Sequence, residues 1–344
     1  MTFNAPACPG LLQRHRALSS RVGNTPLVRF DALAKGLSPN VSIHAKLEWH
    51  QIGGSVKARA AHGILGDAII DPASQGRQLL DASSGNTGIA YGALCAALGL
   101  PLTLCLPSNA SPERKAILRG FGVDVIETSP FDGTDGAQAR CRELVAEHPD
   151  RYYYLDQYSH PANRRAHRQG TAEEIWAQTA GQVTHFVAGL GTTGSFNGTT
   201  SRLKELNPTI HCTAFQPDSA LHGLEGWKHM ETARVPEIHY PSIADAHRTV
   251  STEAAYSMIR TVAATEGLLI SPSAAANLCA ALEVARDLDA GTVVTLLADD
   301  ASKYGDVLAH LFKAPTACPP CPPSAGPTAT QKAAPATSTR RPYR

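Results

Sequence analysis

The sequence predicts an α/β fold of two domains, each a mostly parallel sheet flanked by helices. From residue 79 onward, short apolar runs alternate with longer amphipathic runs, which is typical of repeated strand–helix units. The alternation forms two series separated by a polar stretch, and 344 residues are enough for about two domains. The first series predicts strands at 79–82, 102–106 and 123–127 and helices at 87–98 and 112–121.

The second series predicts strands at 185–188, 211–215 and 292–298 and helices at 170–179, 194–205, 252–266 and 274–288. A further helix is expected to run from Ala58 to Leu65. The polar segments 107–112 and 156–168 are expected to be loops at the open ends of the sheets, where α/β proteins bind ligands.

The composition is ordinary for a globular protein, with 43% apolar residues, 18% charged residues and a net charge of +1. This small charge argues against a general nucleic-acid surface. Residues 1–20 lack the apolar core of a secretory signal, and no run is long and apolar enough to span a membrane. We therefore expect a cytoplasmic protein with neither a nucleic-acid nor a membrane partner.

Eight cysteines are scattered without a repeated pair spacing, and most are expected to fill buried apolar space. Cys318 and Cys321 have the spacing of metal ligands, but they stand in a Pro-, Ala- and Thr-rich tail without a second pair. No metal site is therefore expected. The tail, residues 313–344, has too little apolar surface to offset its ordering entropy and is expected to be disordered.

A glycine-rich segment, Gly189-Leu190-Gly191-Thr192-Thr193-Gly194-Ser195, follows the expected strand 185–188. Glycines let successive N–H groups converge on an anion, and the hydroxyls add donors where a helix begins. The segment predicts a cup for one phosphate of a small cofactor. A plain strand-to-helix turn is the alternative.

Lys57 stands at the start of the helix that runs through 58–65, after Gly53-Gly54-Ser55-Val56. The helix dipole and partial burial both disfavour a charged ammonium there, so the amine could attack an aldehyde. A solvated surface lysine is the alternative.

The segment Ser83-Ser84-Gly85-Asn86-Thr87-Gly88 offers hydroxyls, an amide and free N–H groups that suit a substrate carboxylate. A well-capped turn explains it equally well. Gln157 could donate to the same carboxylate, and Ser271-Pro272-Ser273 alone would be interpreted as a helix N-cap.

Together these segments resemble the cysteine synthase and cystathionine beta-synthase family of pyridoxal-phosphate enzymes, which has fold type II, the tryptophan synthase β-like fold. The resemblance runs from about Gly23 to Leu311. It is carried, in family order, by 23–27, 46–48, 54–57, 84–88, 157–163 and the glycine-rich segment.

The resemblance implies pyridoxal 5′-phosphate as cofactor and a role for each matching residue. Lys57 would bind the cofactor covalently and later move the substrate's Cα proton. Asn86 would contact the cofactor's 3′-oxygen, and Ser273 would face its pyridine nitrogen. The phosphate would lie on Gly189, Gly191, Thr192, Thr193, Gly194 and Ser195. The substrate carboxylate would lie on Ser83, Ser84, Gly85, Thr87 and Gln157.

The resemblance also implies the domain limits and a homodimer. A small mobile domain would comprise 46–160, and a large domain with the phosphate site would comprise 13–45 and 161–312.

A hydroxyl beside the pyridine nitrogen makes the ring a weak electron sink and favours prompt loss of a β-leaving group. The implied reaction is β-replacement on an activated L-serine, O-acetylserine or O-phosphoserine, through an aminoacrylate intermediate. The product would be L-cysteine, with sulfide or a sulfur-carrier protein as the sulfur donor. A synthase using an amine or another thiol, with a diaminopropionate- or cystathionine-type product, is one alternative. A catalytically weak regulatory homologue is the other.

The largest departure from the family pattern is the bulky, charged stretch 222–230 in place of a small glycine-rich loop. Lys228 adds positive charge there, which predicts a contact with an anionic leaving group such as phosphate. A solvated Lys228 is the alternative.

Overall fold

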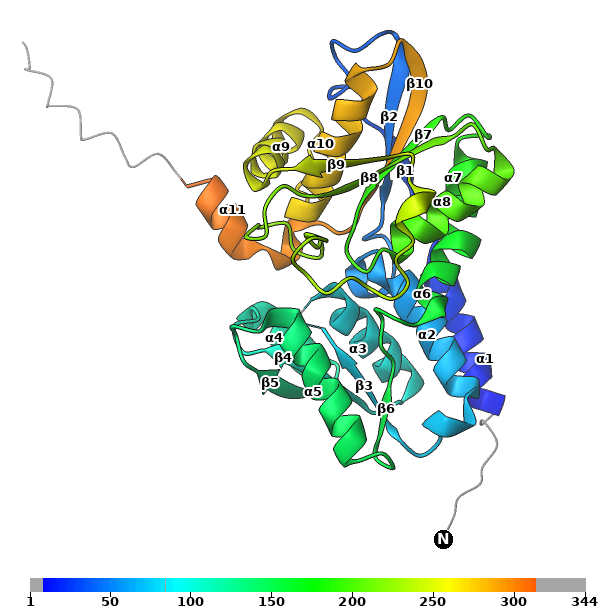
Figure 1. Cartoon of the computed structure of the whole chain (residues 1–344), viewed down its shortest axis with the longest axis vertical. Coiled ribbons are helices and arrows are strands. Elements are labelled where there is room, and N and C mark those ends of the chain that lie inside the picture. The colour runs from blue at the N-terminus through cyan, green and yellow to red at the C-terminus, as the bar shows by residue number, and fades with distance from the viewer. Residues whose placement is uncertain (1–8, 84, 314–344) are drawn as a thin grey trace, which may run out of the picture.

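The computed structural model describes residues 9–83 and 85–313. Figure 1 shows two lobes, each built around its own sheet. The larger sheet has the strand order β1-β2-β10-β7-β8-β9, and all its neighbours are parallel except β1 and β2. The strands are β1 Leu27–Arg29, β2 Asn40–Leu47, β7 His185–Gly189, β8 His211–Pro217, β9 Ala246–Val250 and β10 Ala290–Leu297.

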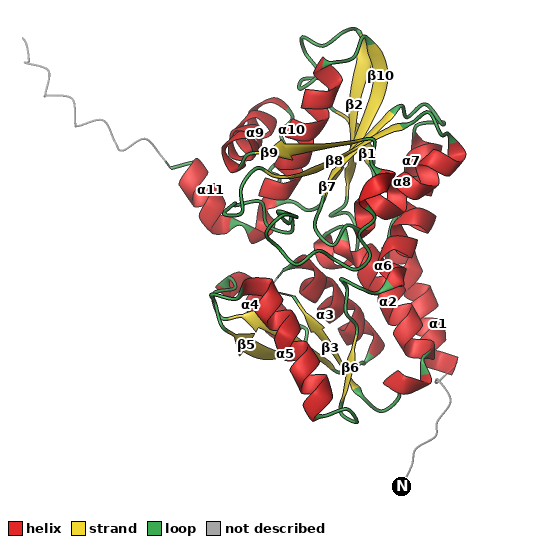
Figure 2. Cartoon of the chain, viewed as in Figure 1, coloured by secondary structure: helices red, strands yellow, loops and turns green. Residues whose placement is uncertain are grey.

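Helices cover both faces of this sheet (Figure 2). Successive residues of a strand point to opposite faces, so Val293 packs beneath α9 and α10 while Val294 packs with α7 and α8. The four helices are α7 Ala172–Gln178, α8 Gly194–Leu206, α9 Thr252–Thr265 and α10 Pro272–Arg286. Such two-sided burial explains the nearly continuous apolar sequence of β7 and β10.

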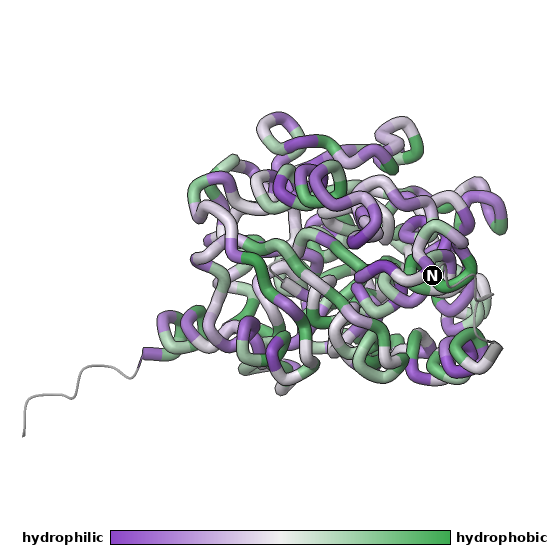
Figure 3. The backbone as a smooth tube through the Cα atoms, turned by 90° about the horizontal axis from the view of Figure 1, so that it is seen from below, coloured by the Kyte–Doolittle hydropathy of each residue, from purple (hydrophilic) through white to green (hydrophobic). Residues whose placement is uncertain are grey.

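The smaller sheet is wholly parallel, with the order β5-β4-β3-β6. Leu79 packs toward α2 and α3, and Leu80 packs toward α5 on the opposite face. The strands are β3 Gln78–Ala82, β4 Leu102–Pro107, β5 Asp124–Thr128 and β6 Tyr152–Tyr154. The remaining helices are α1 Pro9–Leu18, α2 Lys57–Ile70, α3 Asn86–Leu98, α4 Pro112–Gly120, α5 Gly133–Glu147, α6 Pro161–Ala166 and α11 Gly305–Leu311. Hydrophobic segments run through the interior, and hydrophilic ones lie on the outer turns and helix surfaces (Figure 3).

The expected α/β architecture with two mostly parallel sheets is confirmed, and every expected strand forms. The expected loop 156–168 is wrong in part, because α6 Pro161–Ala166 lies within it. His160 accepts a hydrogen bond from the backbone N–H of Ala162 at 3.2 Å, and Pro161 occupies the first turn, so this polar stretch carries its own helix-start signal. The expected boundary at residue 46 falls inside β2, which continues to Leu47.

Four cysteines, Cys95, Cys105, Cys141 and Cys212, are buried, whereas Cys279 is half-buried. The Cys318 and Cys321 pair and the tail lie outside the described residues. Within the described ranges, no helix could cross a membrane, and no three His, Cys, Asp or Glu side chains gather as a metal site.

Candidate active site

A cavity of about 650 Å³ lies between the two sheets. It is lined by the starts of α2, α3, α8 and α10, by the residues after β10 and by a long segment after β8. We call residues 218–245 the β8–β9 loop. The expected site residues that line the cavity are Lys57, Ser83, Gly85, Asn86, Thr87, Gln157, Gly189, Gly191, Thr192, Thr193, Ser195, Lys228 and Ser273. Ser84 lies outside the described residues.

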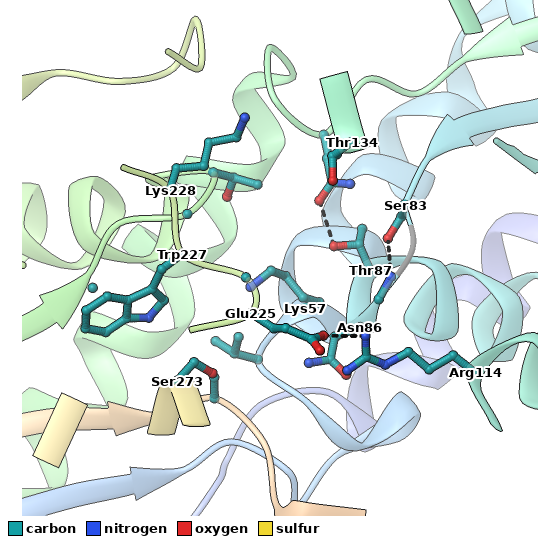
Figure 4. A pocket seen from close by; sticks show the side chains of 18 of the residues that line it. Lys57, Ser83, Asn86, Thr87, Arg114, Thr134, Glu225, Trp227, Lys228 and Ser273 are labelled. Carbon is teal, nitrogen blue, oxygen red and sulfur yellow. Dashed lines mark hydrogen bonds and ion pairs between the residues drawn. The ribbon is translucent and has the colours of Figure 1, made fainter. Parts of the chain in front are cut away.

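Lys57 is the first residue of α2 and points into the cavity (Figure 4). Its backbone N–H donates to Ser55 Oγ at 3.4 Å, whereas no hydrogen bond or ion pair within the described part of the chain engages its Nζ. Burial lowers the pKa of its ammonium, and the negative charges of Asp299 and Glu48 oppose this effect only in part. A lowered pKa gives the amine the neutral form that a nucleophile or a base requires.

The start of α2 is held by a buried ionic network. Arg59 donates to Glu48 at 2.7 Å and to Glu174 at 2.6 Å, and Lys46 lies 2.6 Å from Glu174. Thr25 joins the network through Glu48 at 2.8 Å. Although burial opposes ionisation, the hydrogen bonds and charges of Arg59 and Lys46 lower the pKa of Glu174 to about 2. The motifs at 23–27 and 46–48 thus fix the helix that carries Lys57.

The start of α3 faces the cavity with two hydroxyls. Ser83 Oγ accepts a hydrogen bond from the backbone N–H of Gly88 at 2.9 Å and so satisfies one of the free N–H groups in the first turn of α3. Thr87 donates to Gln157 Oε1 at 2.6 Å, and Gln157 donates from Nε2 to Ala82 O at 3.0 Å. One Nε2 hydrogen of Gln157 remains for a ligand. The two residues expected to hold a carboxylate are therefore already joined in one network.

The glycine-rich segment turns from β7 into α8 along the cavity wall. Thr193 has a φ of 69°, in the left-handed region, immediately before the helix begins at Gly194. A Cβ on Gly191 would lie 2.0 Å from the carbonyl oxygen of Gly226, and one on Gly194 would lie 2.0 Å from Asn163 Oδ1. Glycine is therefore required at both positions. Gly194 does not itself line the cavity, so its contribution is this close packing.

Neighbouring side chains fix the hydroxyls of this segment. Asn163 Nδ2 donates to Thr192 Oγ1 at 3.0 Å, and Ser195 Oγ lies 3.0 Å from His167 Nε2. Burial lowers the pKa of His167 well below its usual value, so the ring is neutral and can accept the Ser195 proton or donate its own. The result is a set of hydroxyl and N–H donors at the N-terminus of a 13-residue helix, which suits a phosphate.

Ser273 lies in the first turn of α10 and lines the cavity. The helix is capped by Ser271, whose Oγ accepts a hydrogen bond from Ala274 N at 3.1 Å. The N-cap is therefore Ser271, and the Ser273 hydroxyl, 3.2 Å from Ser271 Oγ, remains available to a ligand. The expected start of this helix at residue 274 is wrong by two residues because Pro272 already belongs to it.

Two ion pairs connect the β8–β9 loop to the smaller lobe. Lys228 Nζ lies 3.2 Å from Asp135 Oδ1, donates to Arg234 O at 3.3 Å, and sits 5.0 Å from the centre of the Tyr158 ring. Glu225 pairs with Arg114 of α4 across the cavity (Figure 4). Lys228 therefore has protein partners of its own.

The sequence interpretation missed several residues at this site. Arg114 lines the cavity although its position in a polar helix suggests a surface residue, and its Nε has no partner within the described chain. Asp299 directly follows the expected strand 292–298, at the carboxyl end of the parallel strand β10, a position that could have flagged it. Four more supporting residues were given no role: Asn163, His167, Asn277 and Lys303.

These features fit a small phosphorylated aldehyde. The donor-rich start of α8 suits its phosphate, the amine of Lys57 suits its carbonyl carbon, and the cavity has room for both the aldehyde and an amino acid. Asn86 and Ser273 supply neutral polar groups between these two ends.

Comparison with known proteins gives the same assignment. The family model described as "Pyridoxal-phosphate dependent enzyme" matches residues 18–299. A cysteine synthase of Aquifex aeolicus is 44% identical over 289 residues, covering 82% of this chain and 88% of that protein. An O-acetylserine dependent cystathionine beta-synthase of Bacillus subtilis is 33% identical over 294 residues, with coverages of 83% and 95%.

Among solved structures, a cysteine synthase from Entamoeba histolytica superposes with a TM-score of 0.80 at 27% identity, covering 92% of this chain and 94% of that one. The expected fold type and cofactor are thereby confirmed. The chain belongs to the pyridoxal-phosphate dependent enzymes and is similar to their cysteine synthases.

Proposed function

We propose that this enzyme replaces the β-substituent of an activated L-serine with sulfur and forms L-cysteine. The carrying observation is the convergence of Lys57, the Thr87–Gln157 pair, the α8 phosphate site and Ser273 on one cavity. The cofactor, when bound, supplies an electron sink that makes the substrate's Cα proton removable. The protein's contribution is to bind, orient and move that proton.

Each residue has a proposed task. The free Nε2 hydrogen of Gln157 and the N–H groups at the start of α3 bind the substrate carboxylate. Lys57 accepts the Cα proton, because its pKa is lowered and its amine faces the cavity. Ser273 presents a neutral hydroxyl to the pyridine nitrogen, so the ring is not held in the protonated form that would stabilise a carbanion. Loss of the β-leaving group is then favoured.

The activated serine is proposed to be O-acetylserine or O-phosphoserine, and the sulfur donor sulfide. The cavity wall carries two cations that could meet an anionic leaving group, Lys228 and Arg114. Each is paired with a carboxylate, Asp135 and Glu225 respectively. The preference for phosphate or acetate as leaving group would therefore depend on whether either cation is released from its carboxylate.

The direct test is product formation. The purified enzyme is mixed with sulfide and either O-acetylserine or O-phosphoserine, and L-cysteine is quantified over time. Lys57→Ala, which removes the proposed base, is the matched control. Cysteine formation by the parent and not by the variant supports the proposal. Absence of cysteine with both serine esters contradicts it.

A synthase that uses a larger thiol or an amine is the second candidate, favoured by the size of the cavity and by the similarity to the cystathionine-forming relative. Replacing sulfide with homocysteine in the same assay separates the two. The retained Lys57, Asn86 and α8 site argue against a regulatory protein without activity.

We further propose, from the family resemblance, that the enzyme is cytoplasmic and forms a homodimer. Light scattering tests the homodimer, which should have twice the monomer mass.

A further inference from the structure

A buried carboxylate, that of Asp299, contacts Asn86 without itself lining the cavity. Asp299 is 0% exposed, and its Oδ2 accepts hydrogen bonds from Asn86 Nδ2 at 2.8 Å and from the Tyr304 hydroxyl at 3.0 Å. Its Oδ1 has no hydrogen-bond partner within the described chain. An ionised carboxylate is costly to bury, so its retention calls for a compensating charge nearby.

Lys303 supplies that charge. Its Nζ lies 3.7 Å from Asp299 Oδ2 and donates to Asn86 Oδ1 at 2.8 Å and to Gly54 O at 2.9 Å. Both ends of the Asn86 amide are therefore hydrogen-bonded to charged groups, the oxygen to an ammonium and the nitrogen to a carboxylate. The reversed orientation would place NH₂ against the ammonium and oxygen against the carboxylate, which is strongly unfavourable.

These two hydrogen bonds determine which group of Asn86 remains free to bind a ligand. Its oxygen is engaged, one Nδ2 hydrogen is used by Asp299, and one Nδ2 hydrogen remains. Asn86 lines the cavity as the first residue of α3, so the remaining hydrogen is the group it can present there. Without the two charged partners, either end of the amide could face the ligand.

The same acid occupies a junction of the site. Asp299 O accepts from Ser271 N at 3.4 Å, at the cap of α10, and the preceding Ala298 O accepts from Val56 N at 2.8 Å, just before Lys57. The residues after β10 thus join the starts of α2, α3 and α10, which carry Lys57, Asn86 and Ser273. A shift of Asp299 would be felt at all three.

We propose that Asp299 and Lys303 are positioning residues that hold Asn86 as an obligate hydrogen-bond donor toward the cofactor's ring oxygen. Neither residue is proposed to contact the cofactor. The inference rests on the proposed placement of Asn86 beside that oxygen. A donor at that place stabilises negative charge on the oxygen, so the two residues set both the retention of the cofactor and its absorbance.

The test uses the holoenzyme and the variants Asp299→Asn, Lys303→Gln and Lys303→Arg, with Tyr304→Phe as the matched control. Tyr304→Phe removes the other hydrogen bond to Asp299 Oδ2 and leaves the Asn86 contact intact. Cofactor release is followed as loss of the visible band after dilution into an excess of a cofactor trap, and the band's position is recorded across pH. Thermal melting of each holoenzyme monitors folding.

Asp299→Asn and Lys303→Gln are expected to release the cofactor roughly tenfold faster and to shift the visible band, because a charge-assisted hydrogen bond is lost. Lys303→Arg should restore most of the parent's behaviour, and Tyr304→Phe should resemble the parent. In an Asn86→Ala background, Asp299→Asn should have no further effect on release or absorbance. That non-additivity is the signature of action through Asn86.

Parent-like release and absorbance in Asp299→Asn and Lys303→Gln would overturn the proposal, as would effects that add fully to those of Asn86→Ala. If Asp299→Asn does not fold, the Lys303 pair decides alone by the same criteria. The proposed function and this inference can fail independently. If the enzyme forms no cysteine but the variants show this pattern of release, only the proposed function is contradicted. If the enzyme forms cysteine but the variants lack the pattern, only the positioning role is contradicted.

Discussion

Arg114 at the start of α4 and Glu225 in the β8–β9 loop form an ion pair that joins the two lobes across the cavity. Arg114 is 7% exposed and lies 5.0 Å from the centre of the Tyr304 ring, whereas the Glu225 side chain is 51% exposed. The cation is thus held in place by the protein, and the more exposed carboxylate is the partner that an anionic substrate could displace.

We predict that Glu225→Gln shifts the substrate preference toward O-phosphoserine. Removing the carboxylate frees Arg114 for a phosphate and removes a repelling charge, so the ratio of kcat/KM values for O-phosphoserine over O-acetylserine should rise roughly tenfold. Steady-state kinetics with both esters measure this. Glu231→Gln, in the same loop but away from the cavity wall, is the control and should leave the ratio unchanged. An unaltered ratio in Glu225→Gln would show that Arg114 is purely structural.

A second prediction concerns Lys57. Lys57→Ala should abolish turnover and covalent attachment of the cofactor while preserving the fold, because the side chain points into the cavity and not into the core. Borohydride reduction of the parent followed by peptide mapping should place the label on Lys57. Lys228 and Lys303 are the informative comparisons, since Lys228 lines the cavity, Lys303 contacts the cavity residue Asn86, and both already have protein partners. A label on either one contradicts the assignment.

The roles of two neighbouring serines separate in a third prediction. Ser273→Asp should protonate the pyridine nitrogen, alter the cofactor's absorbance and slow loss of the β-leaving group. Ser271→Ala should instead lower the free energy of unfolding by about 0.5–2 kcal/mol through loss of the N-cap, with the absorbance unchanged. Absorbance spectra and denaturant unfolding of both variants give the answer. Equal elimination rates in Ser273→Asp and the parent would refute the electronic role.

Much of this site was accessible from the sequence because its residues follow strands at short distances along the chain. The glycine-rich turn after β7, Ser83 to Thr87 after β3 and Lys57 at a helix start are each recognisable locally, and the first two lie at the carboxyl ends of parallel strands, where α/β proteins bind ligands. The family resemblance then assigned each a task.

The rest depends on how the two lobes face each other. The Arg114–Glu225 and Lys228–Asp135 pairs join elements from different sheets, and no local pattern specifies such contacts. The hydrogen bonds that Asp299 and Lys303 make with Asn86 could not be predicted either, since both residues lie far from Asn86 in sequence. Charged residues such as these are expected at the surface, and their burial follows from tertiary structure alone.

A fourth prediction is a pH dependence of stability from Asp81. Burial raises the pKa of this carboxyl group, which lies in β3 next to its last residue Ala82, from 3.8 to about 8. The folded state therefore binds the proton more tightly than the unfolded chain, and this stabilisation is complete below pH 3.8 and is lost as the pH rises toward 8. Asp81→Asn removes the titration, so the Tm of the variant relative to the parent should climb between pH 5 and 8.

Melting curves across that range provide the measurement. Asp71→Asn is the control, because hydrogen bonds from Tyr153 and Ala73 lower the pKa of Asp71 and place its titration below this window. Its Tm should run parallel to that of the parent. Parallel curves for Asp81→Asn as well would mean that Asp81 is ionised in the folded protein throughout.

The last prediction tests whether Lys228 binds an anionic leaving group. Its ammonium lies at the cavity wall, but Asp135, Arg234 O and the Tyr158 ring already surround it. A dianionic phosphate can compete with the single, partly exposed carboxylate of Asp135, whereas a neutral acetyl ester cannot. Lys228→Ala should therefore lower kcat/KM for O-phosphoserine by about 1.5–3 kcal/mol and spare O-acetylserine. Asp135→Asn, which frees the ammonium, should raise kcat/KM for O-phosphoserine. Equal decreases of kcat/KM for both esters in both variants would instead show that the Lys228–Asp135 pair only holds α5 and the β8–β9 loop together.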